Sequence, residues 1–393
     1  MDQDEMRGSE PELVVRLQEE IAASGPITLA RFMERALYEP ELGYYQRARR
    51  SPGRGGDFLT SPEVHPFFGF TIARQIAECW EQLGRPETFV IREYGAGIGG
   101  LAYDILAALA TAHADCFAAT RYELVEVNPH RLADALSAMA EVGLVDRVVA
   151  RSPEEAAREP IVGVVLANEV ADAIPAHQLV VTDGRLRERF VTWDDAAGWF
   201  AWMIDDVSDP VMQSGVVAHL EEAGVVATLP EGALLEVSPA AATWMTSLAE
   251  GVDRGVALIV DYGYPTADLY AGHRLGGLLR GYHEHTVTDD PFVRIGRQDL
   301  TTHVDLGWLL RAAARAGMTA LGVTTQADFL AALGLGDLLV GLQGDGETSF
   351  DGYLQAQAAV LRLIDPGGLG RFRVLGLAKG WPEDVGLRGF GGE

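Results

Sequence analysis

The middle of the chain alternates short apolar runs with segments of helical periodicity. The apolar runs predict strands near 89–94, 121–127, 161–167 and 255–261. The third and fourth runs are almost purely aliphatic, which is typical of strands buried on both faces of a parallel sheet. Leu101, Ile105 and Leu109 follow the first run at helical spacing. The pattern therefore predicts an α/β fold with a doubly wound, mostly parallel sheet.

Further elements are expected on both sides of this core. Helical spacing predicts two helices within 11–37 and single helices at 66–83, 303–316 and 354–364. Thr28 is expected to cap the second of the N-terminal helices through its hydroxyl group. Residues 38–60 are rich in Gly, Pro and Arg and predict a loop. Two more strands are expected at 318–324 and at 371–378, the latter at a sheet edge.

Residues 179–235 interrupt the alternation of strands and helices. Short antiparallel strands are expected there, with Asp183-Gly184 as a hairpin turn, and we interpret the segment as an inserted lid over the site. The expected organisation is a helical segment with a cofactor-covering loop at 1–88, the first part of the core at 89–178, the lid at 179–235, and the second part of the core at 236–393. A substrate-side loop is expected within the last part, at 264–302.

A glycine turn follows the first predicted strand. Gly95, Gly97 and Gly99 let the backbone turn sharply before a helix, where its N–H groups can approach a nucleotide-like cofactor. Glu126, at the end of the next strand, is placed to bind ribose hydroxyls. It lies 27 residues after Gly99, whereas a dinucleotide fold expects its acid about 20 residues on. The spacing favours S-adenosyl-L-methionine (SAM) over NAD(P), and an NAD(P)-dependent oxidoreductase remains the alternative.

Polar residues stand at the carboxyl ends of all four core strands. They are Glu93, Glu126, Asn168 with Glu169, and Asp261. Ligands of open α/β sheets bind outside these strand ends. Together the four ends predict a single site, which is stronger support than any one motif.

Composition limits the partners. The net charge of −26 disfavours nucleic acid, which needs clustered Lys and Arg, and mildly favours a cationic acceptor. Cys79 and Cys116 are too few for a disulfide framework, and the first ten residues are acidic and polar, so we expect a cytoplasmic protein. No apolar run is long enough for a membrane span. A homodimer is the default expectation for the oligomeric state.

Six segments, taken together and in order, resemble one family. They are 28–45, 56–63, the glycine turn at 95–99, Asn168-Glu-Val-Ala-Asp-Ala-Ile-Pro175, Asp261-Tyr-Gly263 and 299–305. The chain resembles the MidA-type SAM-dependent methyltransferases, some of which methylate an arginine of a partner protein. The resemblance covers about residues 25–380. It implies a seven-stranded Rossmann-like methyltransferase sheet with an antiparallel last strand.

The resemblance also implies SAM as cofactor, S-adenosyl-L-homocysteine as product, and roles for particular residues. The turn of Gly95, Ala96, Gly97 and Gly99 should line the methionine end of SAM, with Glu93 just before it, and Glu126 should hold the ribose. The segment of Gly56, Asp57, Phe58 and Thr60 should fold over the cofactor. Asn168, Glu169 and Asp172 should face the acceptor, and Asn168 also the cofactor. Glu169 and Asp172, spaced i and i+3, could together hold a cationic acceptor.

Other assignments remain open at this point. The family usually carries Pro and Arg where this chain has Ala96 and Ile98, so the acceptor is either a protein arginine or a small metabolite, methylated on nitrogen or oxygen. A catalytically silent assembly factor is a third alternative. His303 is a candidate general base oriented by Asp299 or Asp305, with helix capping as the alternative for these acids. The histidines at 283, 285 and 303 lack zinc-site spacing, so no metal is expected.

Overall fold

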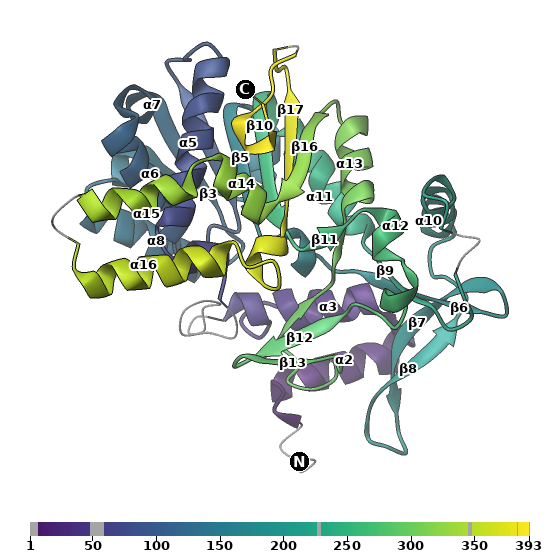
Figure 1. The fold of residues 1–393 in the computed structure, drawn as a ribbon. Coiled ribbons are helices and arrows are strands. Elements are labelled where there is room, and N and C mark those ends of the chain that lie inside the picture. Colours follow the sequence, from purple (N-terminus) through teal and green to yellow (C-terminus); the bar gives the residue numbers. More distant parts are fainter. Residues whose placement is uncertain (1–6, 48–58, 226–228, 345–347, 383, 393) are drawn as a thin grey trace.

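A seven-stranded mixed sheet forms the centre of the molecule in the computed structural model (Figure 1). The structure describes residues 7–47, 59–225, 229–344, 348–382 and 384–392. The strand order is β16 (Thr319–Thr325), β17 (Arg373–Lys379), β10 (Val252–Asp261), β5 (Ile161–Asn168), β2 (Phe89–Tyr94), β3 (Thr120–Val125) and β4 (Val148–Arg151). The five strands from β10 to β4 pair in parallel, and β17 runs antiparallel to both of its neighbours.

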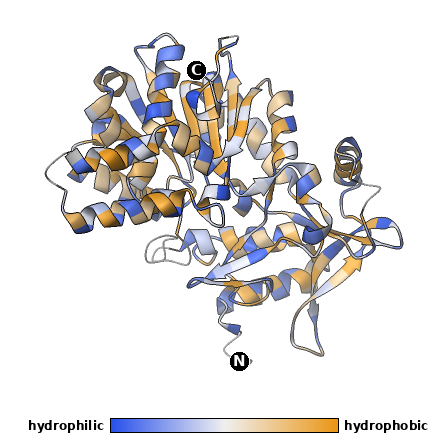
Figure 2. Ribbon diagram, in the orientation of Figure 1, coloured by the Kyte–Doolittle hydropathy of each residue, from blue (hydrophilic) through white to orange (hydrophobic). Residues whose placement is uncertain are grey.

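Helices cover both faces of this sheet, because the core strands present apolar side chains to both sides. One face packs mainly against α5 (Phe67–Gln82), α6 (Gly100–Ala112), α8 (Pro129–Glu141), α14 (Gln326–Ala332) and α16 (Phe350–Leu363). The other packs against α9 (Pro153–Arg158), α11 (Pro239–Glu250) and α13 (Leu306–Arg315). Apolar residues concentrate in the central strands and along the helix faces turned toward them (Figure 2). The α/β, doubly wound prediction is confirmed.

A second sheet joins segments that lie far apart in the sequence. β7 (Arg185–Asp194) pairs with β1 (Ile27–Thr28), β6 (His177–Thr182) and β8 (Trp199–Asp205), and β6 also pairs with β9 (Leu234–Val237). Asp183 and Gly184 have φ values of 53° and 67°, as a tight hairpin turn requires. The segment after β8 also contains α10 (Pro210–Glu222), which the apolar pattern did not predict.

The N-terminal helices pack beside this second sheet. α2 (Pro11–Ser24) and α3 (Leu29–Tyr38) share a core with the aromatic residues Trp199, Phe200 and Phe292. The Thr28 hydroxyl caps α3 by accepting a hydrogen bond from the Arg31 N–H at 3.1 Å. A small sheet of β12 (Arg280–His283), β13 (Thr286–Thr288) and β14 (Asp299–Thr301) lies next to these helices (Figure 1).

The remaining short elements complete the chain. They are α4 (Ser61–Val64), α7 (Ala114–Ala119), β11 (Gly263–Tyr264), α12 (Thr266–Leu269), β15 (Val304–Asp305) and α15 (Leu335–Gly344).

One expectation about the central sheet was wrong, and one of its strands was not predicted. β17 is not at an edge: β16 lies outside it, so its residues Val374, Leu375 and Leu377 are buried between two neighbours. The edge strand β4 was missed, because its four residues, Val148–Arg151, are too few and too exposed to form an apolar run.

Candidate active site

A cavity of about 580 Å³ opens at the carboxyl ends of β2, β3 and β5. Its volume lies in the range of small-molecule sites. Residues from these strand ends line it together with residues from the N-terminal segment, from α4 and from α11. The glycine turn and the segment after β5 therefore face one crevice.

The glycine turn has the backbone conformation that glycine permits. Gly95, Gly97 and Gly99 have φ values of 68°, 55° and 81°, in the left-handed region. Gly95 and Gly97 line the cavity, and no atom outside the turn lies within 4 Å of where a Gly97 side chain would begin. Gly99 does not line it, since a side chain there would meet Ala135 and Met139 of α8 at 3.2 Å. Ala96 lines the cavity beside them.

Glu126 lines the same cavity and is held by backbone N–H groups. Its two carboxylate oxygens accept hydrogen bonds from the N–H of Gly97 at 2.8 Å and from that of Asn128 at 2.9 Å. Each oxygen keeps a further lone pair that can accept a hydrogen bond from a ligand hydroxyl group. The carboxylate is thus already oriented before any ligand arrives.

Glu93 and Glu169 are carboxyl groups with perturbed acidity. Burial raises the pKa of Glu93 to about 8, although Tyr122 donates a hydrogen bond to it at 2.7 Å. Desolvation also raises the pKa of Glu169 to about 8, and the neighbouring Asp172 adds to that shift. Both line the cavity, and neither forms an ion pair within the described part of the chain.

Glu169 is also strained. Its φ of 54° is unusual for a residue with a side chain, and strain of this kind concentrates at functional sites. Its Oε1 accepts hydrogen bonds from Asn168 Nδ2 at 2.9 Å and from the N–H of Ser61 at 3.3 Å. Asn168 Oδ1 is buried without a hydrogen-bond partner in the described structure, so the site offers a ligand one unused acceptor.

Asp172 and Asp261 lie behind the cavity wall rather than in it. Asp261 Oδ2 accepts hydrogen bonds from the N–H of Ala171 at 2.9 Å and from that of Asp172 at 3.3 Å. Burial raises the pKa of both carboxyls, most strongly that of Asp261. These contacts hold the turn that follows Glu169. Asp172 was expected to face the acceptor, but it does not line the cavity.

His303 is apart from this cavity as well. Its ring packs edge-on against Tyr262 and Tyr264, and its buried Nδ1 has no hydrogen-bond partner in the described structure. Burial, together with nearby Arg371, lowers its pKa to about 4. Neither acid orients it: Asp305 caps α13 and binds His219 at 2.8 Å, while Asp299 accepts a hydrogen bond from the Tyr45 hydroxyl at 2.8 Å. His303 is thus not placed as a base toward the cavity.

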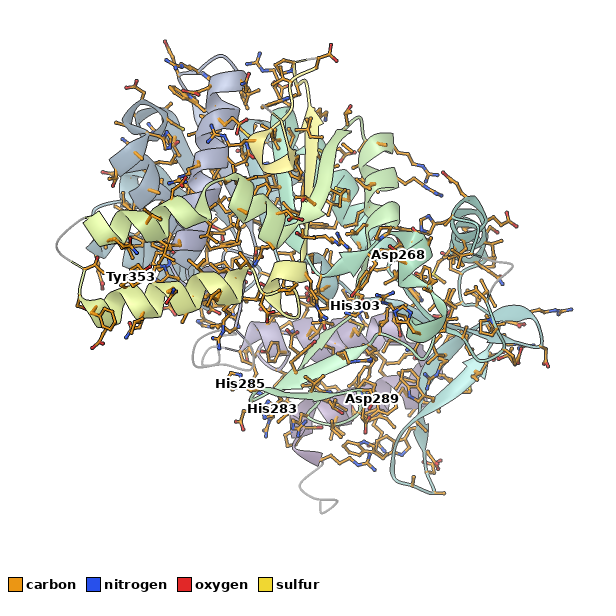
Figure 3. The ribbon with its side chains drawn as sticks, viewed as in Figure 1. Asp268, His283, His285, Asp289, His303 and Tyr353 are labelled. Carbon is orange, nitrogen blue, oxygen red and sulfur yellow. The ribbon has the colours of Figure 1, made fainter. Side chains whose placement is uncertain are left out.

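The other histidines of the sequence analysis lie on a different element. His283 ends β12 and His285 follows it in the turn to β13, away from His303 (Figure 3). Within the described ranges, no group of three or more His, Cys, Asp or Glu side chains could hold a metal ion. The aromatic residues of the 179–235 segment, for which lining a lid and ordinary hairpin packing are equally compatible with the sequence, pack on one another, on the N-terminal helices and on Phe292; they are Trp193, Trp199, Phe200 and Trp202.

Several cavity residues were not expected from the sequence. Tyr38, Tyr45, Tyr103, Arg131 and Trp244 all line it. Tyr38 and Tyr45 stack with ring centroids 5.5 Å apart, and the Tyr38 hydroxyl donates to the Ala173 carbonyl at 3.0 Å. Both tyrosines fall within the 28–45 segment that contributes to the family resemblance, so this motif was the sequence feature that could have indicated them. Thr60 lines the cavity as expected, whereas Gly56, Asp57 and Phe58 lie outside the described residues.

The strand order, the antiparallel β17, and a glycine turn that faces an acid on the next strand define a Rossmann-like SAM-dependent methyltransferase. Residues 71–324 match the family described as "Putative S-adenosyl-L-methionine-dependent methyltransferase". The chain belongs to this family. SAM is therefore its cofactor, which decides between the two cofactors that the glycine turn left open.

Solved and curated relatives agree with this assignment. The structure of a COG1565 superfamily member from Burkholderia thailandensis, bound to S-adenosyl-homocysteine, is 31% identical; the match covers 99% of this chain and 96% of that one, with a TM-score of 0.85. The mitochondrial protein arginine methyltransferase NDUFAF7 of Danio rerio is 29% identical over 82% of this chain and 76% of its own length. The Homo sapiens protein of that name is 26% identical over 81% and 72%.

The expected cytoplasmic location was wrong. The curated relatives from Drosophila melanogaster, Danio rerio, Mus musculus and Homo sapiens are all named as mitochondrial. The prediction depended on two free cysteines and an acidic N-terminus, and neither feature distinguishes the cytoplasm from a mitochondrion. In the ranges that the structure describes, no helix is long and apolar enough to cross a membrane.

Proposed function

We propose that this methyltransferase acts on a guanidinium nitrogen of an arginine in a partner protein. The observation that carries the proposal is Glu169, a strained carboxyl with a raised pKa in the same cavity as the glycine turn. A buried acid without a cationic partner is costly unless a ligand supplies the cation. The names of the curated relatives support the same acceptor.

The cavity residues fit SAM. The open space at Gly97 leaves room for the methionine end, the oriented Glu126 carboxylate suits the ribose hydroxyls, and Asn168 Oδ1 can accept a hydrogen bond from the cofactor's ammonium group. When bound, SAM supplies an electrophilic methyl group on its sulfonium. The protein's task is then to align the acceptor and exclude water.

Glu169 would hold the acceptor and take up its proton. An opposite charge favours the ionised form of a carboxyl, so an arriving guanidinium lowers the pKa of Glu169 and forms charge-assisted hydrogen bonds with it. As a guanidinium nitrogen gains the methyl group it loses one proton, which the carboxylate can accept. Asn168 Nδ2 and the Ser61 N–H keep Glu169 in place for this step.

Asp172 and Asp261 would act as positioning residues. The Asp261 carboxylate fixes the backbone after Glu169 by accepting hydrogen bonds from the N–H groups of Ala171 and Asp172, and neither aspartate lines the cavity.

A small apolar metabolite is the second candidate acceptor. Val170, Ile174 and Trp244 give part of the cavity an uncharged lining. Such an acceptor needs no carboxylate, so it would give no functional reason for burying Glu169 in the cavity.

Labelled SAM and a lysate of the source organism test the two acceptors. We expect label in the protein fraction, released as methylated arginine after acid hydrolysis. The Glu169→Gln variant should lose this labelling, while Glu141→Gln, at an exposed position on α8, should keep it. Label found only in small molecules would contradict the proposal and favour the metabolite.

A further inference from the structure

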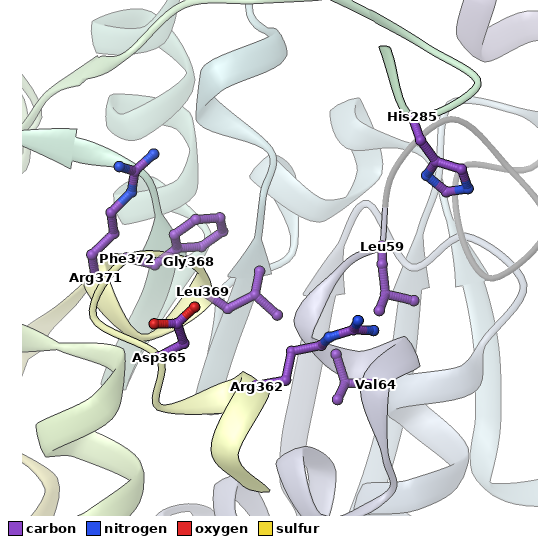
Figure 4. A pocket seen from close by; sticks show the side chains of 9 residues that line it. All are labelled: Leu59, Val64, His285, Arg362, Asp365, Gly368, Leu369, Arg371 and Phe372. Carbon is purple, nitrogen blue, oxygen red and sulfur yellow. The ribbon is translucent and has the colours of Figure 1, made fainter. Parts of the chain in front are cut away.

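Figure 4 shows a second cavity, of about 590 Å³, which is lined in part by the α4 segment that also lines the cofactor cavity. Three separate segments form its walls. Leu59 and Val64 come from the region of α4, His285 from the β12–β13 turn, and the remainder from the last turn of α16 and its connection to β17. Nothing in the methyl-transfer chemistry above uses this space.

Two arginines give this basic cleft its charge. Arg362 and Arg371 both line it, with Asp365 between them (Figure 4). Neither guanidinium has an ion pair or hydrogen bond within the described structure. The Asp365 carboxylate, whose Oδ1 accepts a hydrogen bond from the Gly367 N–H at 2.9 Å, offsets one of these two positive charges, so the cleft keeps an excess of positive charge. Two unpaired guanidinium groups in one cleft are notable in a chain with a net charge of −26.

The short helix α4 connects the basic cleft to the active site. Leu59 and Val64 line the cleft, while Thr60, Pro62 and Glu63 line the cofactor cavity. In the same helix the Ser61 N–H donates to Glu169 at 3.3 Å. A four-residue helix is about 6 Å long, so an extended peptide at about 3.3 Å per residue passes from one cavity to the other within a few residues.

The surroundings fit a polypeptide better than a small anion. Leu369 and Phe372 add apolar wall to the cleft. Beyond Arg362, helix α16 carries an apolar stripe of Phe350, Leu354 and Leu361, with exposed fractions of 75%, 42% and 61%. Exposed apolar side chains on the helix that carries Arg362 are available to contact another protein chain, whereas a free phosphate would have no use for them.

We propose that the basic cleft binds an acidic segment of the protein acceptor, a few residues away from the arginine that is methylated. The inference rests on the proposed function and adds a rule for choosing the substrate. The target arginine enters the acidic crevice, and flanking Asp or Glu side chains pair with Arg362 and Arg371. Elsewhere the negative protein repels such a segment, so the cleft also fixes its direction of approach.

Two labelled peptides test this on the full-length enzyme loaded with S-adenosyl-L-homocysteine. One contains a single arginine with four glutamates on one side, and its partner has glutamines in their place. By fluorescence anisotropy we expect the acidic peptide to bind about tenfold more tightly. Arg362→Gln/Arg371→Gln should remove that difference, and the charge-matched control Arg185→Gln/Arg315→Gln, at exposed positions elsewhere, should keep it. Unchanged affinity for S-adenosyl-L-homocysteine shows that each variant is folded.

The outcomes separate the cleft from the proposed function. Equal binding and equal methylation of both peptides would overturn the proposal that the basic cleft binds an acidic segment, and would leave the proposal of arginine methylation intact. Selective binding of the acidic peptide without methyl transfer from SAM would uphold the cleft and contradict arginine methylation. Displacement by inorganic phosphate, at concentrations where sodium chloride of equal ionic strength has no effect, would make the cleft a phosphate site and overturn the proposal.

Discussion

Arg92 and Glu93 are neighbours on β2, yet the structure treats their charges in opposite ways. Arg92 is fully buried, and its Nε donates to Glu123 at 2.6 Å. Its other nitrogens donate to backbone carbonyls of Ala156, Gly251 and Glu159. Glu93 points to the other face, toward the cavity, where Tyr122 donates a hydrogen bond to it and no cation pairs with it among the residues that the structure describes.

The comparison separates charge that stabilises the fold from charge that is available to a ligand. On the Arg92 face, each guanidinium nitrogen of Arg92 has a hydrogen-bond partner, as a buried ion needs. On the Glu93 face, acids gather at the strand ends with raised pKa values, which is characteristic of functional sites. A buried charge in this protein is therefore informative only together with its partners.

The largest effect is expected from breaking the paired face. Arg92→Met leaves Glu123 buried without its closest cation, and we expect a loss of about 3–5 kcal/mol in unfolding free energy. The midpoint of urea denaturation measures it. The double variant Arg92→Met/Glu123→Leu should recover part of the loss; an equal loss in both would show that packing, not charge, explains the effect.

The next effect concerns the unpaired face. Glu169→Gln keeps the size of the side chain but removes the charge, so we expect turnover on an arginine acceptor to fall by about 10²–10³-fold. Calorimetry should show the affinity for SAM changed by less than about twofold. A parallel loss of SAM affinity would place Glu169 in the cofactor site instead.

Glu126 tests the cofactor side of the same crevice. Glu126→Ala should weaken the binding of S-adenosyl-L-homocysteine by about 1–3 kcal/mol through lost hydrogen bonds to the ribose. Glu126→Gln, which retains one carbonyl oxygen as acceptor, should lose less. Wild-type affinity in the alanine variant would mean that the ribose lies elsewhere.

The smallest effect is a pH dependence of stability. The folded-state pKa of Glu169 is about 8 against an ordinary value of 4.5, so its contribution to stability is complete below pH 4.5 and is lost as the pH rises through 8. The melting temperature of Glu169→Gln should match that of the wild type at pH 5 and exceed it by a few degrees at pH 9. A constant difference across this range would argue against the raised pKa.

The sequence predicted the central sheet well, because buried parallel strands leave a clear aliphatic pattern. β5 and β10 were located from such runs, and the left-handed turn from its glycines. The short edge strand β4 could not be predicted, because its exposed residues form no apolar run. The interior position of β17 could not be predicted either, because the order of strands in the sheet does not follow their order in the chain.

The candidate site was predicted in outline only. Residues adjoining the strand ends, such as Glu93, Glu126 and Glu169, reach the cavity because strand direction places them there. Asp172 and His303 were assigned from spacing and composition, which say nothing about the direction of a side chain. Tyr38 and Tyr45 come from a distant segment, and only tertiary packing brings them to the crevice.

The alternation of Arg92 and Glu93 on opposite faces of β2 also favours the native strand register during folding. Shifting a strand by one residue turns every side chain to the opposite face. Such a slip would press the Glu93 carboxylate against the carbonyls that now receive Arg92, and would leave a guanidinium in the crevice instead of an acid. A shifted β2 would therefore carry an electrostatic cost on both faces of the sheet. Arg92 and Glu93 together thus favour the native register of this strand.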